Sequence, residues 1–146
     1  MKISILSSGS KGNCTYIQTK KHKILIDIGT SSLYVEKSLK SIGVNPEDID
    51  MILITHAHID HVGGLKVFSK KYNPLVYISD KILKESNLKI ENISSEEDVI
   101  IKSDINIRSI KLSHDVDDIR GFVIEEDNSS MVYITDTGYI NENNFQ

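Results

Sequence analysis

Tryptophan is absent from this chain of 146 residues, which has only two prolines and one cysteine. The single Cys14 excludes an internal disulfide, and a lone thiol is typical of a reducing compartment. No apolar run approaches the roughly 18 residues that a membrane-spanning helix needs. The N-terminal MKISILSSGSKGN also lacks the apolar core and small-residue cleavage site of a signal peptide. We therefore expect a cytoplasmic protein with no membrane partner.

An excess of basic residues is also missing. The net charge is -4, with 17 lysines and arginines against 21 aspartates and glutamates, which argues against a generally basic nucleic-acid surface. The hydrophobic fraction of 39% and the charged fraction of 26% are typical of one globular domain. Phosphate chemistry stays open, because two bound divalent ions would neutralise the formal charge and concentrate it in one site.

Short β-branched runs dominate the chain. Strands are expected at Lys2–Leu6, Thr15–Thr19, Lys23–Ile28, Met51–Thr55, Leu75–Ile78, Asp98–Lys102, Ile105–Leu112, Gly121–Glu125 and Ser130–Thr135. Helices are expected at Ser31–Ile42, Gly64–Tyr72 and Lys81–Glu85. In the first helix, Leu33, Leu39 and Ile42 fall at near-helical spacing. The order predicts a mixed α+β or α/β domain, with the apolar run Met51–Thr55 as a buried central strand.

The stretch THAHIDHVGG, residues 55–64, follows that strand and holds three of the five histidines. His56 and His58 are two positions apart, so in an extended segment their side chains leave the same side and can converge on one ion. Asp60 continues this phase and His61 breaks it. The spacing therefore favours two neighbouring metals. One metal with three ligands is an alternative, and a histidine-rich surface loop without metal is another.

Two further metal-type side chains follow apolar strands later in the chain. His114 comes after the strand Ile105–Leu112, and Asp136 comes after Ser130–Thr135. Taken singly, each has an ordinary explanation, since a strand-end aspartate near glycine usually forms a turn and a histidine often has a structural role. Together with the cluster they form a more specific set of metal ligands.

These motifs resemble those of the metallo-β-lactamase-fold hydrolases. HAHIDH resembles the defining H-x-H-x-D-H motif, and ILIDIG at 24–29, LSHD at 112–115 and TDTG at 135–138 resemble the other motifs, in the same order. The opening SSGSKGNC at 7–14 resembles the YycJ/WalJ (VicX) branch of that family. The resemblance implies a metallo-β-lactamase-like αββα sandwich, of which residues 1–146 would be the N-terminal half.

The resemblance also implies roles for individual residues. It implies six ligands for two divalent ions, zinc or manganese: His56, His58 and His114 for the first, Asp60 and His61 for the second, and Asp136 bridging both. Asp27 would steady the histidine loop by hydrogen bonds, although a simple strand-end turn is the alternative. Asp60 would be the catalytic residue that orients a hydroxide or accepts its proton.

The implied activity is that of a metal-dependent hydrolase, a phosphodiesterase and 5′-exonuclease acting on DNA. The N-terminal loop offers hydroxyls, an ammonium and an amide that could contact a phosphate, namely Ser8, Ser10, Lys11 and Asn13. An ordinary Gly/Ser turn is the alternative for this loop. A small-molecule hydrolase of lactones, thioesters or phosphodiesters, and a non-catalytic metal-binding regulatory module, are the competing functions.

The chain departs from the family pattern at its end. The family's last histidine, a ligand of the second metal, has no candidate here, because the remaining His22 lies early in the chain. We therefore expect a weak second metal site, which puts catalysis by this chain alone in doubt. We also expect exposed sheet surface, and hence self-association of the chain.

Overall fold

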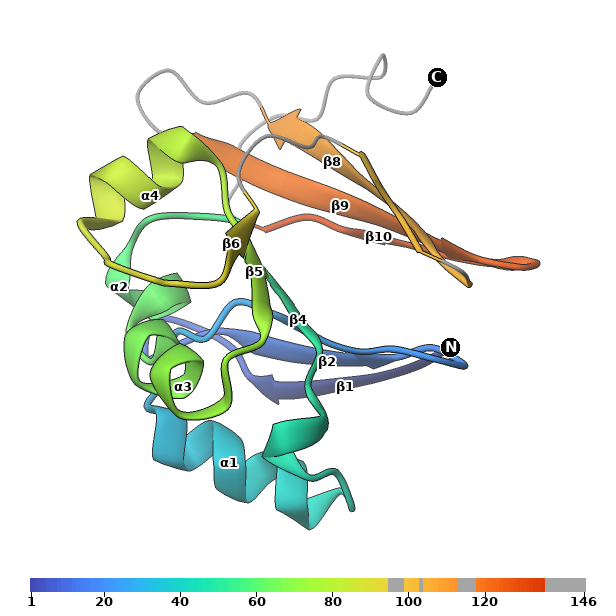
Figure 1. The fold of residues 1–146 in the computed structure, drawn as a ribbon, viewed down its shortest axis with the longest axis horizontal. Coiled ribbons are helices and arrows are strands. Elements are labelled where there is room, and N and C mark those ends of the chain that lie inside the picture. The colour runs from blue at the N-terminus through green and yellow to red at the C-terminus, as the bar shows by residue number, and fades with distance from the viewer. Residues whose placement is uncertain (95–98, 103, 113–117, 136–146) are drawn as a thin grey trace.

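The computed structural model describes residues 1–94, 99–102, 104–112 and 118–135. In this part of the chain, two β-sheets face each other and helices cover the opposite face of the larger sheet (Figure 1). The predicted ligands His114 and Asp136 lie outside the described residues. This layering confirms the predicted mixed α/β fold class.

The first sheet has six strands in the order β1-β2-β3-β4-β5-β6. Their bounds are Lys2–Ser7, Cys14–Gln18, Lys23–Ile26, Met51–Leu53, Leu75–Tyr77 and Ile93–Ser94. The strands β1, β2 and β3 pair antiparallel, whereas β3, β4, β5 and β6 pair parallel. The carboxyl ends of the four parallel strands therefore meet at one edge of the sheet, where sites in α/β sheets are commonly found.

The second sheet has four antiparallel strands in the order β10-β9-β8-β7. Their bounds are Ser129–Tyr133, Ile119–Glu126, Asn106–Leu112 and Val99–Ile101. The helices are α1 Ser32–Ser41, α2 Ile59–Val62, α3 Leu65–Tyr72 and α4 Asp80–Ser86, with a 3-10 turn at Pro46–Asp48. No helix of the described residues is long and apolar enough to cross a membrane.

Alternation along the central strands builds two apolar cores. Leu25 and Ile52 point toward the helices, where they join Leu39, Leu65 and Phe68. Their neighbours on the other face point toward the second sheet: Ile24, Ile26, Met51 and Leu53 pack with Ile107, Phe122 and Ile124. Because both faces of β3 and β4 are buried, these strands are apolar from Ile24 to Ile26 and from Met51 to Leu53.

The buried face of α1 differs from the predicted one. Leu33 is 59% exposed and Ile42 is 43% exposed, whereas Val35 and Leu39 are fully buried. Residues four apart share a helix face, as Val35 and Leu39 do. Leu33 is six positions from Leu39 and lies on another face. The helix does begin as expected, since the Ser31 side chain accepts a hydrogen bond from the Tyr34 amide.

The metal-type cluster is also less extended than predicted. Helix α2 begins after His58, so Asp60 and His61 lie on a helical turn and not in an extended segment. The alternating phase expected for His56, His58 and Asp60 is therefore wrong beyond His58. The two-residue strand β6 was not predicted, because so short a pairing leaves no periodic signal.

Candidate metal centre

The histidine cluster lies at the carboxyl end of the central strand β4. The His56 ring is 3.8 Å from the His58 ring and 5.1 Å from the His61 ring, measured between centroids. His56 is 4% exposed and His61 is fully buried, whereas His58 is exposed. The chain therefore holds three imidazoles together at the sheet edge, with one of them open to solvent.

Asp27 holds His61 from the end of the neighbouring strand β3. Its Oδ2 lies 2.8 Å from His61 Nδ1 and accepts a hydrogen bond of 2.6 Å from the Thr55 hydroxyl, while its Oδ1 accepts one of 2.8 Å from the Thr55 amide. A carboxylate accepts, so Nδ1 carries the ring proton and Nε2 keeps its lone pair. That Nε2 lies 3.5 Å from Asp60 Oδ2, which places two metal-type donor atoms side by side.

The conformation of Asp27 is costly. Its backbone is left-handed, with φ of 62°, and its side chain is fully buried. Burial raises the pKa of the Asp27 carboxyl, and the hydrogen bonds from His61 and Thr55 act against that rise. A strained backbone and a buried carboxyl are both unfavourable for stability, and such features gather at functional sites.

The N-terminal loop supports the same helical turn. The Asn13 amide donates to the Asp60 carbonyl at 2.8 Å, and Asn13 Nδ2 lies 3.1 Å from that carbonyl and 3.4 Å from Asp60 Oδ2. Asn13 also bonds both backbone groups of Gly9 at 3.1 Å. These bonds show Asn13 as a support for Asp60, while its predicted phosphate contact stays a prediction.

Close backbone packing joins the loops at 12–13, 29–30 and 60–64. A Cβ added to Gly29 would lie 1.6 Å from the Asp60 carbonyl oxygen and 2.6 Å from the Asn13 nitrogen. A Cβ on Gly12 would lie 2.7 Å from the backbone of Gly29. Only glycine allows this approach, so the backbone carrying Asp60 is held without intervening side chains.

The other residues of the N-terminal loop point outward. Ser8, Ser10 and Lys11 are exposed, whereas the Ser7 hydroxyl donates to the Gly12 carbonyl at 2.8 Å and stays within the loop. The exposed three are open to a ligand, and their phosphate contact stays a prediction.

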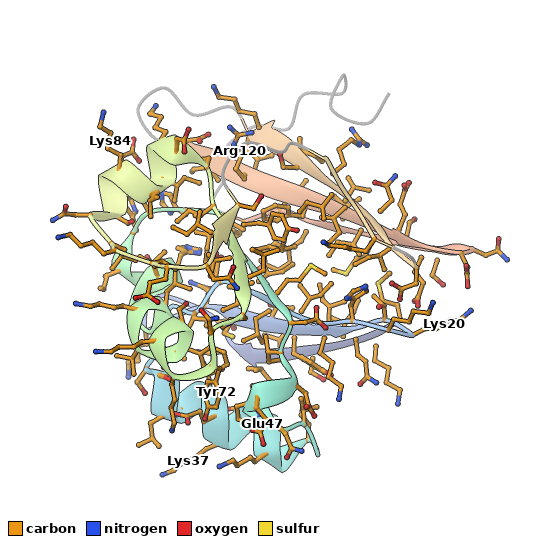
Figure 2. The ribbon with its side chains drawn as sticks, viewed as in Figure 1. Lys20, Lys37, Glu47, Tyr72, Lys84 and Arg120 are labelled. Carbon is orange, nitrogen blue, oxygen red and sulfur yellow. The ribbon has the colours of Figure 1, made fainter. Side chains whose placement is uncertain are left out.

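A buried ion pair at the start of β9 had no sequence signal. Asp118 is 2% exposed and accepts from the Ser79 hydroxyl at 2.6 Å and from Arg120 Nε at 3.1 Å. The Arg120 amide then donates to the Thr55 carbonyl at 2.8 Å, next to His56. Arg120, labelled in Figure 2, therefore ties the second sheet to the end of β4. Asp118 and Arg120 lie in a polar stretch of the sequence. The burial of Asp118 and their contacts with Ser79 and Thr55 become evident only when the two sheets are packed together.

The side chains of the cluster have the chemistry of ligands for a divalent ion. Within the described ranges, no three histidine, cysteine or carboxylate side chains stand ready as a metal-binding group. The set nevertheless contains imidazoles, a half-exposed carboxylate at Asp60 and an orienting carboxylate at Asp27, which is the chemistry of zinc and manganese sites. His114 and Asp136, outside those ranges, are the further ligands that the sequence predicts.

Comparison with known proteins identifies one family and several relatives. A family model described as the metallo-beta-lactamase superfamily matches residues 8–140. The chain is 37% identical to "Exodeoxyribonuclease WalJ" of Streptococcus pneumoniae and 34% identical to "Exodeoxyribonuclease YycJ" of Bacillus anthracis. Each match covers 97% of this chain and 56% of the relative, so the chain spans little more than half the length of these relatives.

Solved structures share the fold at low identity. The Rm3 metallo-beta-lactamase superposes with a TM-score of 0.72 at 18% identity, over 89% of this chain and 57% of that one. A metallo-beta-lactamase mutant from Cronobacter sakazakii gives a TM-score of 0.77 at 16% identity, over 98% and 66%. At such identities the likeness concerns the architecture alone.

Proposed function

Because the chain belongs to the metallo-β-lactamase superfamily, we propose that it carries the metal-binding part of a hydrolase that cleaves DNA from the 5′ end. The observation that carries the proposal is the buried contact between Asp27 and His61 at 2.8 Å, beside Asp60. A carboxylate that fixes the tautomer of a histidine is a recurrent feature of metal sites. The names of the relatives, both exodeoxyribonucleases, support DNA as the substrate.

The residues would divide the work as follows. His56, His58 and His114 would hold one divalent ion, Asp60 and His61 a second, and Asp136 both. When bound, such ions supply hydroxide near neutral pH and neutralise charge on a phosphodiester. Asp60, half-buried and held by Asn13, would orient the attacking nucleophile or accept its proton. Asp27 would keep His61 in the ligating tautomer.

The exposed Ser8, Ser10 and Lys11 would contact the phosphate next to the bond being cut. They belong to the same loop as Asn13, which holds Asp60 by hydrogen bonds. A short loop with backbone amides and one ammonium suits a single phosphate group. Zinc and manganese both suit this mixture of imidazole and carboxylate ligands.

The test combines metal counting with DNA cleavage. We expect this chain to bind zinc or manganese. We expect a form lengthened to match the relatives, of which this chain covers 56%, to release the label from 5′-labelled single-stranded DNA only when one of these ions is added. Asp60→Asn should abolish cleavage and weaken binding of one ion, whereas Asp80→Asn, an exposed aspartate on α4, should change neither. Unchanged cleavage in Asp60→Asn would refute the assigned role. A single tightly held ion without cleavage would favour the regulatory module instead.

A further inference from the structure

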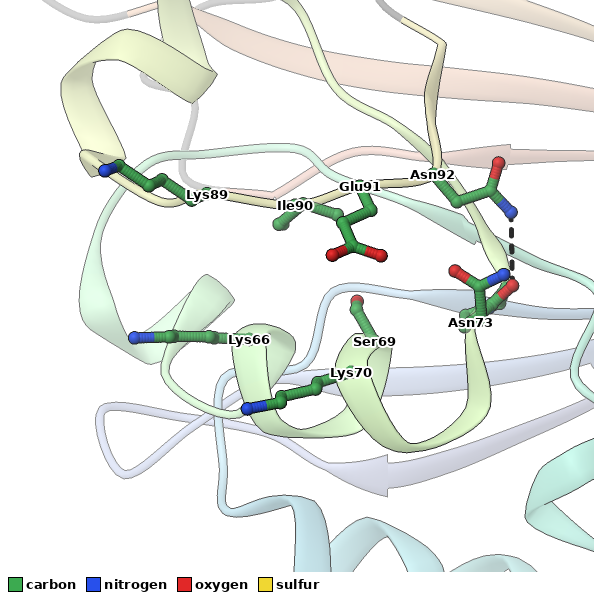
Figure 3. Close-up of a pocket in the computed structure, with 9 residues that line it drawn as sticks. Lys66, Ser69, Lys70, Asn73, Lys89, Ile90, Glu91 and Asn92 are labelled. Atoms are coloured by element: carbon green, nitrogen blue, oxygen red, sulfur yellow. Dashed lines mark hydrogen bonds between the residues drawn. The ribbon is translucent and has the colours of Figure 1, made fainter.

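A cavity with charged and polar side chains in its lining lies outside the metal centre, between α3 and the segment 89–92. Its volume is about 300 Å³ (Figure 3). One end is closed by a hydrogen bond of 3.1 Å from Asn92 Nδ2 to the Asn73 carbonyl. Lys66 and Lys70 line the α3 side and Lys89 the opposite side. None of these residues belongs to the predicted metal ligands.

Ser69 presents a buried hydroxyl to this cavity. The residue is 8% exposed, and its Oγ has no hydrogen-bond partner in the described part of the chain. Figure 3 shows the hydroxyl pointing from α3 toward the carboxylate of Glu91 on the other wall. A serine inside a helix ordinarily bonds a carbonyl of the preceding turn or points to solvent. A buried hydroxyl that does neither lowers stability, which a ligand of the cavity would compensate.

The charge around the cavity is positive in a chain that is negative overall. Lys66, Lys70 and Lys89 oppose the single carboxylate of Glu91, a local balance of about +2, against -4 for the chain. The described residues place no carboxylate within ion-pair distance of these three ammonium groups. The neighbouring Lys71, by contrast, is paired with Glu36 at 2.5 Å. The cavity lysines are therefore free to receive an anion.

We propose that this cavity binds a small phosphate ester that carries hydroxyl groups, in the chemical class of the nucleoside monophosphates. The ammonium groups of Lys66, Lys70 and Lys89 would donate to the phosphate oxygens. The Glu91 carboxylate would accept from a sugar hydroxyl, and Ser69 would complete that contact. Ile90 supplies an apolar wall. The volume lies at the lower end of the range for small-molecule sites, about 300–1,000 Å³.

The combination of groups narrows the ligand class. A bare anion would gain from the lysines but would face the Glu91 carboxylate, and a neutral sugar would leave the lysines unused. A ligand with both a phosphate and hydroxyl donors satisfies the three lysines and the Glu91 carboxylate together. The proposal is independent of the nuclease reaction, although the ligand is of the class that such a reaction releases.

The test is a nuclear magnetic resonance titration of the 15N-labelled chain without added metal. The probes are deoxyadenosine monophosphate, deoxyadenosine, inorganic phosphate and a short single-stranded DNA. We expect the monophosphate to shift amides of residues 66–73 and 89–92. The double change Lys66→Ala and Lys70→Ala should weaken binding at least tenfold. The matched double change Lys37→Ala and Lys40→Ala, on the exposed side of α1, should leave it unchanged.

Ser69→Ala separates a ligand role from a structural one. It removes an unsatisfied hydroxyl, so we expect equal or higher thermal stability together with several-fold weaker binding of the monophosphate. The proposal is overturned if these amides do not shift, if deoxyadenosine or inorganic phosphate binds as tightly as the monophosphate, or if only DNA binds. The titration is done without added metal, so its result does not depend on cleavage. A failed cleavage assay would therefore refute the nuclease proposal and leave the proposed ligand site untouched.

Discussion

Asp27→Asn tests whether one buried carboxylate sets the chemistry of the metal centre. The carboxylate is fully buried and accepts three hydrogen bonds, two from Thr55 and one from His61. Asparagine keeps an oxygen for the Thr55 amide, but its NH2 group replaces Oδ2. That NH2 group donates, so His61 Nδ1 must become an acceptor and the ring proton must move to Nε2. The nitrogen beside Asp60 would then be blocked.

The expected size of the effect follows from these contacts. Hydrogen bonds to a charged group contribute about 1.5–3 kcal/mol each, and two bonds to Oδ2 are lost or reversed. Relief of the buried charge offsets part of this loss, since burial raises the pKa of Asp27. We expect the free energy of unfolding to fall by about 1.5–3 kcal/mol. Loss of the orienting carboxylate should weaken metal binding about 10–100-fold.

Two measurements check this prediction. Nuclear magnetic resonance of 15N-labelled histidine reports the tautomer of His61, and zinc titration by calorimetry reports the affinity. Asp50→Asn is the matched control, because Asp50 Oδ1 lies 3.2 Å from His22 Nδ1 on the surface. If Asp27→Asn leaves both the His61 tautomer and the zinc affinity unchanged, Asp27 does not orient a ligand.

Three further predictions concern the framework around the site. Gly29→Ala should lower the free energy of unfolding by about 1–3 kcal/mol or more in denaturant titrations, because a Cβ there would meet backbone atoms at 1.6 Å; wild-type stability would contradict the close packing. The hydrogen bond from the Lys71 ammonium holds the pKa of Glu36 below its ordinary 4.5. Ionised Glu36 therefore contributes fully to the stability of the folded state above pH 4.5, and this contribution is lost as the pH falls through the lowered pKa. Glu36→Gln should therefore flatten the dependence of unfolding on pH in the acid range, and an equally steep dependence would refute this reasoning. Ile5 is 70% exposed on the edge strand β1, so we expect concentration-dependent self-association in light scattering that Ile5→Lys reduces; a monomer at all concentrations would contradict it.

Strand positions were the most predictable part of the fold. Residues 23–28 were predicted as a strand and residues 51–55 as a buried central strand, and the structure has β3 and β4 there. These runs are informative because a strand buried on both faces is nearly continuous in apolar residues. The exposed Leu33 shows where this reasoning fails, since it depends on which face of α1 meets α3. That choice is made by packing, and α1 uses Glu36 there, bonded to Lys71.

The candidate site divides in the same way. The cluster of His56, His58, Asp60 and His61 could be predicted from sequence because a dense group of metal-type side chains after a buried strand is chemically specific. The supporting contacts of Asn13 and Asp118 could not be predicted in this way. Ser79 and Asp118 lie 39 positions apart, and the loop of Asn13 meets that of Asp60 across 47 positions. A local sequence pattern cannot predict contacts between residues so far apart in the chain.

The amino-acid order by itself determined the strand sequence, the histidine cluster and the family, because each depends on neighbouring residues or on a short motif. The resemblance predicted hydrogen bonds from Asp27 to the histidine loop, but only the tertiary structure identified His61 as its partner ring. Only the tertiary structure decided that Asn13 supports Asp60 and that the Ser69 hydroxyl is buried in a lysine-lined cavity. These contacts depend on how parallel strands end at a common edge and how glycines let three loops approach each other. Metal-type residues are thus recognised from sequence, whereas their protonation and orientation come from partners that folding brings close.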